Sequence, residues 1–208
     1  MQALLKKEYL VNKQSIIINL IIMIIFSLAL GVFGRIMSYG IFMSCYLPVS
    51  NESYESSIKS DIFINSLPVT REKIVFSKYL FSLLTGAFYL SIVFLISIYI
   101  PIFESITIKE LMIGSAVVSI YLSAYYPLKF YIGQIHFAIS FVGFWIIILA
   151  FIFPVINYGE SFDYWGMYNA YTTYTTLQVV SISIIISCIA LSVSYRYSSE
   201  IYKSKDIS

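Results

Sequence analysis

Charged residues are scarce in this sequence. Asp, Glu, Lys and Arg make up 12% of its 208 residues, whereas about 25% is usual in a soluble domain. Hydrophobic residues make up 59%, and the mean hydropathy is +0.84. Because so few charges cannot cover a water-facing surface, the composition excludes a disordered protein, a secreted domain held by disulfides and a cytosolic enzyme. It indicates an integral membrane protein.

Groups that carry catalysis or bind metals are also scarce. The sequence has one histidine, His136, and its two cysteines, Cys45 and Cys188, lack the spacing of metal ligands. It contains neither an HExxH nor a GxxxxGK[ST] motif, and no predicted span has in its middle the ionisable residue that an ion-coupled carrier needs. The net charge of +2 is too small to favour a nucleic-acid partner. We therefore expect a chain that is not an enzyme, holds no metal or cofactor itself and does not bind nucleic acid.

Long apolar stretches are what the sequence has instead, and a bilayer is crossed by roughly 20 such residues. The candidate spans are Gln14–Gly34, Ile36–Asn51, Tyr79–Phe103, Leu111–Leu128, Phe130–Gly159 and Tyr164–Tyr195. The second is short, but if it crosses, all lysines and arginines except Arg35 and Lys109 lie on one side. Because lysine and arginine favour the cytoplasmic side, we predict an all-α integral membrane protein with six transmembrane helices and cytoplasmic N- and C-termini.

The predicted layout is a single transmembrane domain over residues 1–208. Its parts are an amphipathic helix (1–13), spans one and two (14–50), a cytoplasmic segment (51–78), spans three and four (79–128), spans five and six with an aromatic outer loop (129–195), and a cytoplasmic tail (196–208). The outer loop, Asn157–Tyr174, contains many tyrosines and Trp165, which suits a membrane interface. A re-entrant element at the outer face is the alternative.

The cytoplasmic segment between spans two and three is longer than the roughly 2–8 residues that usually join helices. Four apolar residues recur in it at near-helical spacing: Ile58, Ile62, Phe63 and Leu67. Pro68 then disfavours helical geometry in the residue before it. Thr70 can cap a second helix, with Glu72 in its first turn, that continues into span three. The pattern predicts an amphipathic helix joined by a proline corner to a spanning helix, and leaves open whether a partner or the membrane covers it.

The N-terminal stretch is also amphipathic. Its apolar residues are Leu4, Leu5, Tyr9 and Val11, and its charged residues are Lys6, Lys7, Glu8 and Lys13. This pattern is typical of a helix that lies along the inner leaflet.

The segment SDIFINSLPVTREKIVFSKYL, residues 60–80, resembles the LNSLPVSRKEIVLSKYL segment of small ABC-2 type permeases, the six-span membrane subunits of bacterial ATP-binding-cassette exporters. The differences are conservative: Ile64 replaces leucine, Thr70 replaces serine, and Glu72-Lys73 reverses the order of lysine and glutamate. The resemblance extends in outline over the whole chain. It is closest to permeases that export peptide toxins such as phenol-soluble modulins or confer resistance to peptide antibiotics.

This resemblance implies a coupling helix that sits in a groove of a separate ATPase subunit, which would bind the ATP and magnesium. The implied ATPase contacts are Asp61, Phe63, Asn65, Ser66, Leu67, Pro68, Val69, Thr70, Arg71 and Glu72. The implied connecting helix contains Leu4, Leu5, Lys6, Lys7 and Tyr9.

The function implied is that of an exporter permease in the plasma membrane, and the Ile- and Tyr-rich composition suits a Gram-positive bacterium. It would pair with a second copy or a related permease and move an amphipathic substrate, a peptide toxin, an antimicrobial peptide or a lipid-like molecule. Its pathway would be lined by Ile, Phe, Tyr, Ser and Thr, with Tyr89, Tyr99, Tyr121, Tyr125, Tyr126 and Trp145 either lining it or packing the spans. The alternative is a non-transporting immunity or assembly protein that uses residues 60–72 to bind a partner.

Overall fold

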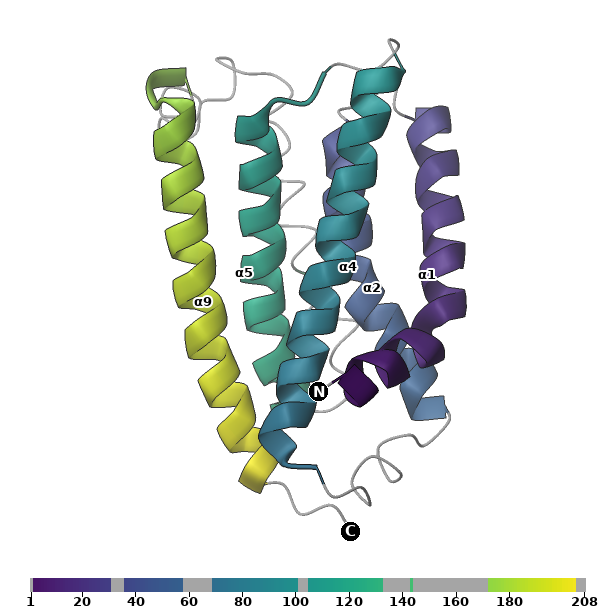
Figure 1. Ribbon diagram of the computed structural model, residues 1–208, viewed down its shortest axis with the longest axis vertical. Coiled ribbons are helices and arrows are strands. Elements are labelled where there is room, and N and C mark those ends of the chain that lie inside the picture. The colour runs from purple at the N-terminus through teal and green to yellow at the C-terminus, as the bar shows by residue number, and fades with distance from the viewer. Residues whose placement is uncertain are drawn as a thin grey trace.

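The computed structural model describes residues 2–30, 36–57, 69–100, 105–132, 143 and 172–204. Over these ranges the chain forms the helices α1 (Gln2–Leu30), α2 (Ile36–Ser57), α4 (Arg71–Tyr99), α5 (Ile108–Ile132) and α9 (Thr176–Ser204), and no strand occurs in them. The helices stand side by side in one bundle (Figure 1). The predicted all-α class is confirmed for this part of the chain.

Four of the helices are long and apolar enough to cross a membrane. They are α4, α5, α9 and, within α1, Leu4–Ile25. Helix α2 has a shorter apolar stretch, Ile36–Ser50, which is below the roughly 20 apolar residues that cross a bilayer, so the predicted second span stays a prediction. The predicted fifth span, Phe130–Gly159, lies almost wholly outside the described residues, so the number of six spans stays a prediction.

The directions of the helices agree with the predicted placement of charge. Helices α2, α5 and α9 run downward in Figure 1, whereas α1 and α4 run upward. The start of α1, the start of α4 and the end of α9 therefore lie together at what we call the lower end of the bundle. Lys109 lies at the opposite end, where its Nζ donates to the Tyr174 carbonyl at 2.7 Å. Helices α5 and α9 run in the same direction. The predicted fifth span lies between them in the sequence, and one further crossing there agrees with these directions.

Small residues set the contact between α2 and α4. A Cβ atom on Gly40 of α2 would lie 3.0 Å from Val93 Cγ2 of α4, and one on Gly86 of α4 would lie 3.6 Å from Ser44 Cβ of α2. The Ser44 hydroxyl lies 2.7 Å from the Gly40 carbonyl and 3.2 Å from the Gly86 carbonyl. Helices in lipid associate through such close backbone approach, so these residues fix how near α2 and α4 come.

Buried tyrosines join the helices through their hydroxyl groups. Tyr89 of α4 donates to the Ile16 carbonyl of α1 at 3.0 Å, and Tyr125 of α5 donates to the Pro48 carbonyl of α2 at 2.8 Å. A hydroxyl away from water needs such an acceptor. Tyr121 and Tyr126 are buried as well. Of the residues expected either to line a pathway or to pack, these four pack; Tyr99 is exposed, and Trp145 lies outside the described residues.

Candidate functional site

Helix α4 begins where the sequence predicts, directly after the proline corner. Thr70 has an extended backbone and precedes the first helical residue, Arg71. Its carbonyl accepts hydrogen bonds from the Lys73 and Ile74 amides at 3.0 and 3.3 Å. Its hydroxyl makes no capping hydrogen bond, so the expected side-chain cap is wrong; Thr70 is exposed, and water can satisfy the free amides of the first turn. Glu72 lies in that turn as predicted.

Four of the ten residues implied as ATPase contacts are described. Val69 and Arg71 are half-buried, and Thr70 and Glu72 are exposed. All four lie at the lower end of the bundle, at the start of α4 (Figure 1). The other six lie outside the described residues: Asp61, Phe63, Asn65, Ser66, Leu67 and Pro68.

The first turn of α4 is fastened to the last turn of α9. Arg71 Nη1 donates to the carbonyls of Tyr202 and Lys203, at 3.2 and 2.8 Å. The neighbouring Glu72 accepts a hydrogen bond from Lys203 Nζ. That hydrogen bond and the carboxylate charge raise the pKa of Lys203, which lies beyond the predicted sixth span, above its ordinary value. The sequence analysis missed this contact, which joins residues 131 and more positions apart.

A buried chain of hydroxyl groups lies deeper in the same end. Tyr79 of α4 contacts Ser194 and Ser198 of α9, the latter at 2.9 Å between oxygens. Ser194 donates its only hydroxyl hydrogen to the Ser123 carbonyl of α5 at 2.6 Å. Tyr79 must therefore donate to Ser194 and accept from Ser198. The chain runs from Ser198 through Tyr79 and Ser194 to α5, and it links three helices.

Pro127 explains why the Ser123 carbonyl accepts from another helix. Pro127 lies inside α5, and a proline has no amide hydrogen to donate to the carbonyl four residues earlier. The freed carbonyl is that of Ser123, which Ser194 satisfies. A proline within a predicted span was thus a sequence signal for this contact.

The N-terminal turns of α1 have a different buried face from the one expected. Glu8 and Asn12 are buried, with 4% and 0% of their surface exposed, whereas Tyr9 is 50% exposed. Asn12 Nδ2 donates to Glu8 Oε2 at 3.4 Å, and Lys7 Nζ donates to Glu8 Oε1 at 3.2 Å. The expectation that Glu8 belongs to the outward charged face is wrong, because Leu4, Glu8 and Asn12 follow at four-residue spacing and share the inward face.

The other residues of the implied connecting helix divide between the two faces. Leu4 is buried, Leu5 and Lys7 are half-buried, and Lys6 is exposed. These turns lie at an angle to the rest of α1 and cross the lower end of the bundle (Figure 1). Their place therefore agrees with a helix near the membrane surface.

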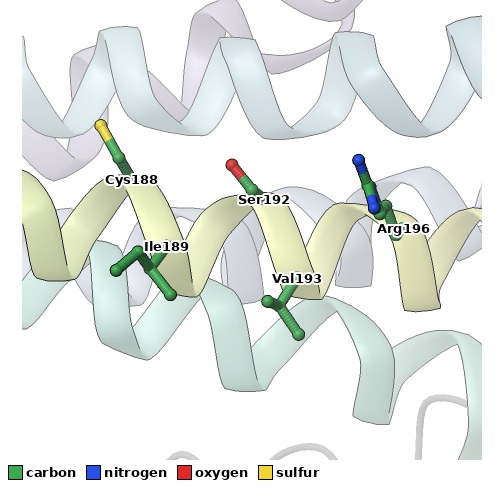
Figure 2. Close-up of a pocket in the computed structure, with 5 residues that line it drawn as sticks. All are labelled: Cys188, Ile189, Ser192, Val193 and Arg196. Atoms are coloured by element: carbon green, nitrogen blue, oxygen red, sulfur yellow. The ribbon is translucent and has the colours of Figure 1, made fainter.

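A pocket of about 370 Å³ opens on α9, and its described lining is Cys188, Ile189, Ser192, Val193 and Arg196. Figure 2 shows Cys188, Ser192 and Arg196 pointing to one side of the helix and Ile189 and Val193 pointing to the other. All five are exposed. The pocket therefore combines apolar surface with a hydroxyl group and one cation at its lower end. The sequence analysis did not recognise this pocket, although Cys188, Ser192 and Arg196 recur at four-residue spacing and so share one face of a helix.

The fold and this site describe a multi-pass helical membrane protein in which the start of α4 is hydrogen-bonded to the end of α9. A family model described as "ABC-2 family transporter protein" matches residues 3–203. The chain therefore belongs to the ABC-2 family of transporters and is the permease of an ABC transporter, a membrane subunit that works with an ATPase subunit. The predicted resemblance of the chain to ABC-2 type permeases is confirmed. No curated protein and no solved structure gives a significant match.

Proposed function

We propose that this permease exports an amphipathic substrate, and that a separate cassette ATPase drives it by pushing on residues 60–72 and the first turn of α4. The family match over residues 3–203 is the observation that carries the proposal. The arrangement of the chain supports it, since α2 ends and α4 begins at the lower end of the bundle (Figure 1). An ATPase bound at this end would meet the start of a helix that runs 29 residues through the bundle.

The pocket on α9 supports the choice of an amphipathic cargo. Ile189 and Val193 offer apolar contacts, and Arg196 offers a positive charge beside them. Arg196 lies one residue beyond the predicted sixth span, close to the level at which headgroups begin. A peptide or lipid-like molecule with an apolar body and a negative or polar end fits this surface. We propose that the working unit contains two permeases, a second copy or a related chain, and two ATPase subunits.

Leu67→Asp tests whether the ATPase drives export through the coupling segment. The substitution places a charge on the predicted apolar face of the coupling segment, so we expect it to abolish export of a labelled amphipathic peptide by membrane vesicles without reducing the amount of permease in the membrane. Arg71→Glu has the same expected effect, but it also breaks the contact with α9, so Leu67 is the sharper choice.

Leu67→Ile is the matched control, and it should export normally. Co-purification with the ATPase is measured in parallel. Normal export by Leu67→Asp would overturn the proposed drive. A stoichiometric partner without ATPase activity would instead favour the non-transporting immunity or assembly protein.

A further inference from the structure

The start of α4 and the end of α9 meet at the lower end of the bundle, and they complement each other chemically. The last four carbonyls of a helix have no amide partner within it, and the C-terminus of a helix attracts positive charge. Arg71 satisfies two of these carbonyls at the end of α9, those of Tyr202 and Lys203. The Glu72–Lys203 pair beside it fixes the direction in which the two ends face each other.

A second attachment lies further along the same two helices. Tyr79 is eight residues after Arg71, about 12 Å along the axis of α4, and its hydroxyl binds Ser194 and Ser198 of α9. Between the two attachments the ring of Phe76 packs edge-on against that of Tyr195, with centroids 5.8 Å apart. One attachment alone would act as a pivot. Two attachments on the same pair of helices also prevent rotation.

We infer that the C-terminal part of α9, from Ser194 to Lys203, belongs to the coupling apparatus, because α4 and α9 are joined so that they move as one lever. This inference rests on the proposed function. A push on the first turn of α4 displaces Arg71 and Glu72, and their contacts carry α9 along. Through Ser194 and the Ser123 carbonyl, α5 follows.

The lever reaches the pocket. Ser192, Val193 and Arg196 line the pocket and alternate along α9 with Ser194 and Ser198, which hold α4. The side chains that meet the cargo and those that receive the push therefore belong to the same two turns of one helix. ATP-driven motion at the lower end moves the wall of the pocket directly.

The test weakens both attachments at residues that are not among the implied ATPase contacts. In the complex of permease and ATPase, Tyr79→Phe removes the hydroxyl and Lys203→Glu reverses the surface charge. We expect the double variant to keep its ATPase but to export at least about 5-fold less peptide per ATP hydrolysed, the lower limit of typical coupling between distant sites. Lys205→Glu, which makes the same charge change in the tail, should behave as the wild type.

Adding Glu72→Lys to the double variant restores a pair of opposite charges at the first attachment. The ratio of export to ATP hydrolysis should then recover to that of Tyr79→Phe alone. A merely destabilised protein would not regain this ratio through a charge exchange. Because Glu72 is also an implied ATPase contact, co-purification with the ATPase is measured for this triple variant as well. Failure to recover in a triple variant that binds its ATPase normally would overturn the assigned role of the Glu72–Lys203 pair.

A cross-link tests the lever itself. Cysteines placed at Glu72 and Lys203, in a Cys188→Ser background, are joined by a short bismaleimide. Because α4 and α9 move together in this inference, the joined protein should still export, as should protein that carries unlinked label. Loss of export with continued ATP hydrolysis would show that the two helices must separate, and would overturn the inference.

The two proposals fail in different ways. If no ATPase co-purifies with the wild type, the proposed function fails and the lever fails with it. If the ATPase binds and the double variant exports like the wild type, only the lever is wrong.

Discussion

Pro127 leaves the carbonyl oxygen of Ser123 without its helical donor, and a side chain from another helix replaces that donor. In lipid no water can take this place, so the replacement has to come from the protein. Ser194 supplies it at 2.6 Å. Pro127 in α5 thus requires a hydrogen-bond donor such as Ser194 in α9, 67 residues further along the chain.

This pairing predicts a coupling between two substitutions. Ser194→Ala leaves the Ser123 carbonyl without a donor and should lower the free energy of unfolding by about 1 kcal/mol. In a Pro127→Ala background the amide of residue 127 can serve that carbonyl, so the same Ser194→Ala change should cost less, and what remains is the loss of the acceptor of Tyr79. Reversible unfolding of the four proteins in mixed micelles measures the difference.

Ser192→Ala is the control, because Ser192 is exposed on the same helix. An equal cost of Ser194→Ala in both backgrounds would show that Ser194 does not replace the hydrogen-bond donor that Pro127 removes.

At the scale of single helices, α1 buries polar side chains and exposes apolar ones, the opposite of the usual arrangement in a water-soluble protein. Its polar residues Glu8, Asn12 and Asn19 are buried, whereas Leu10 and Ile18 are exposed, at 59% and 55%. Asn19 Nδ2 donates to Ser50 Oγ of α2 at 3.2 Å. Apolar side chains are compatible with lipid, while polar ones in a spanning helix turn toward the protein. The polar stripe therefore marks the inward face of α1.

Two neighbouring substitutions distinguish the faces of α1. Glu8→Ala removes the buried acceptor of Asn12 and should lower the free energy of unfolding by about 1–3 kcal/mol. Tyr9→Ala changes an exposed side chain and should stay within about 0.5 kcal/mol of the wild type. Thermal unfolding in nanodiscs, followed by tryptophan fluorescence, measures both. A larger loss for Tyr9→Ala would mean that the tyrosine side, and not the carboxylate side, docks on the bundle.

At the scale of the whole molecule, the bundle has two chemically different ends. The lower end gathers Arg71, Lys73 and Lys203, whereas Lys109 lies at the other end, on the carbonyl of Tyr174. This separation follows the rule that lysine and arginine collect on the cytoplasmic side. Only 11% of the most apolar window of α9 is buried inside the protein, so the exposed residues of this window are available to lipid or to another chain.

Labelling of introduced cysteines tests the orientation, since Cys45, the native cysteine that remains after Cys188→Ser, is fully buried. In a Cys188→Ser background, Lys109→Cys should react with a membrane-impermeant maleimide in intact cells. Lys203→Cys should react only after the membrane is opened, because the predicted six spans place it in the cytoplasm. Labelling of Lys203→Cys in intact cells would contradict both the cytoplasmic C-terminus and the even number of spans.

Much of the fold and a part of the site could be predicted from the sequence. Composition gave the class, and the apolar stretches located the described helices. Thr70 and Glu72 marked the start of α4 to the residue, and the helix runs from there into the predicted third span without a break. Helix α9, however, continues to Ser204, through residues expected only to form a tail. Apolar length alone does not show where a helix ends beyond the membrane.

By itself, the sequence determined that this protein is a helical membrane protein, because hydrophobicity decides what enters a bilayer and basic residues decide which side stays inside, and the resemblance in residues 60–80 indicated a permease. Only the tertiary structure decided which face of each helix turns inward and which distant groups meet. Lipid is as apolar as a protein core, so hydrophobic periodicity does not separate the two environments. The contact of Arg71 with the end of α9 therefore becomes visible only when the helices are packed.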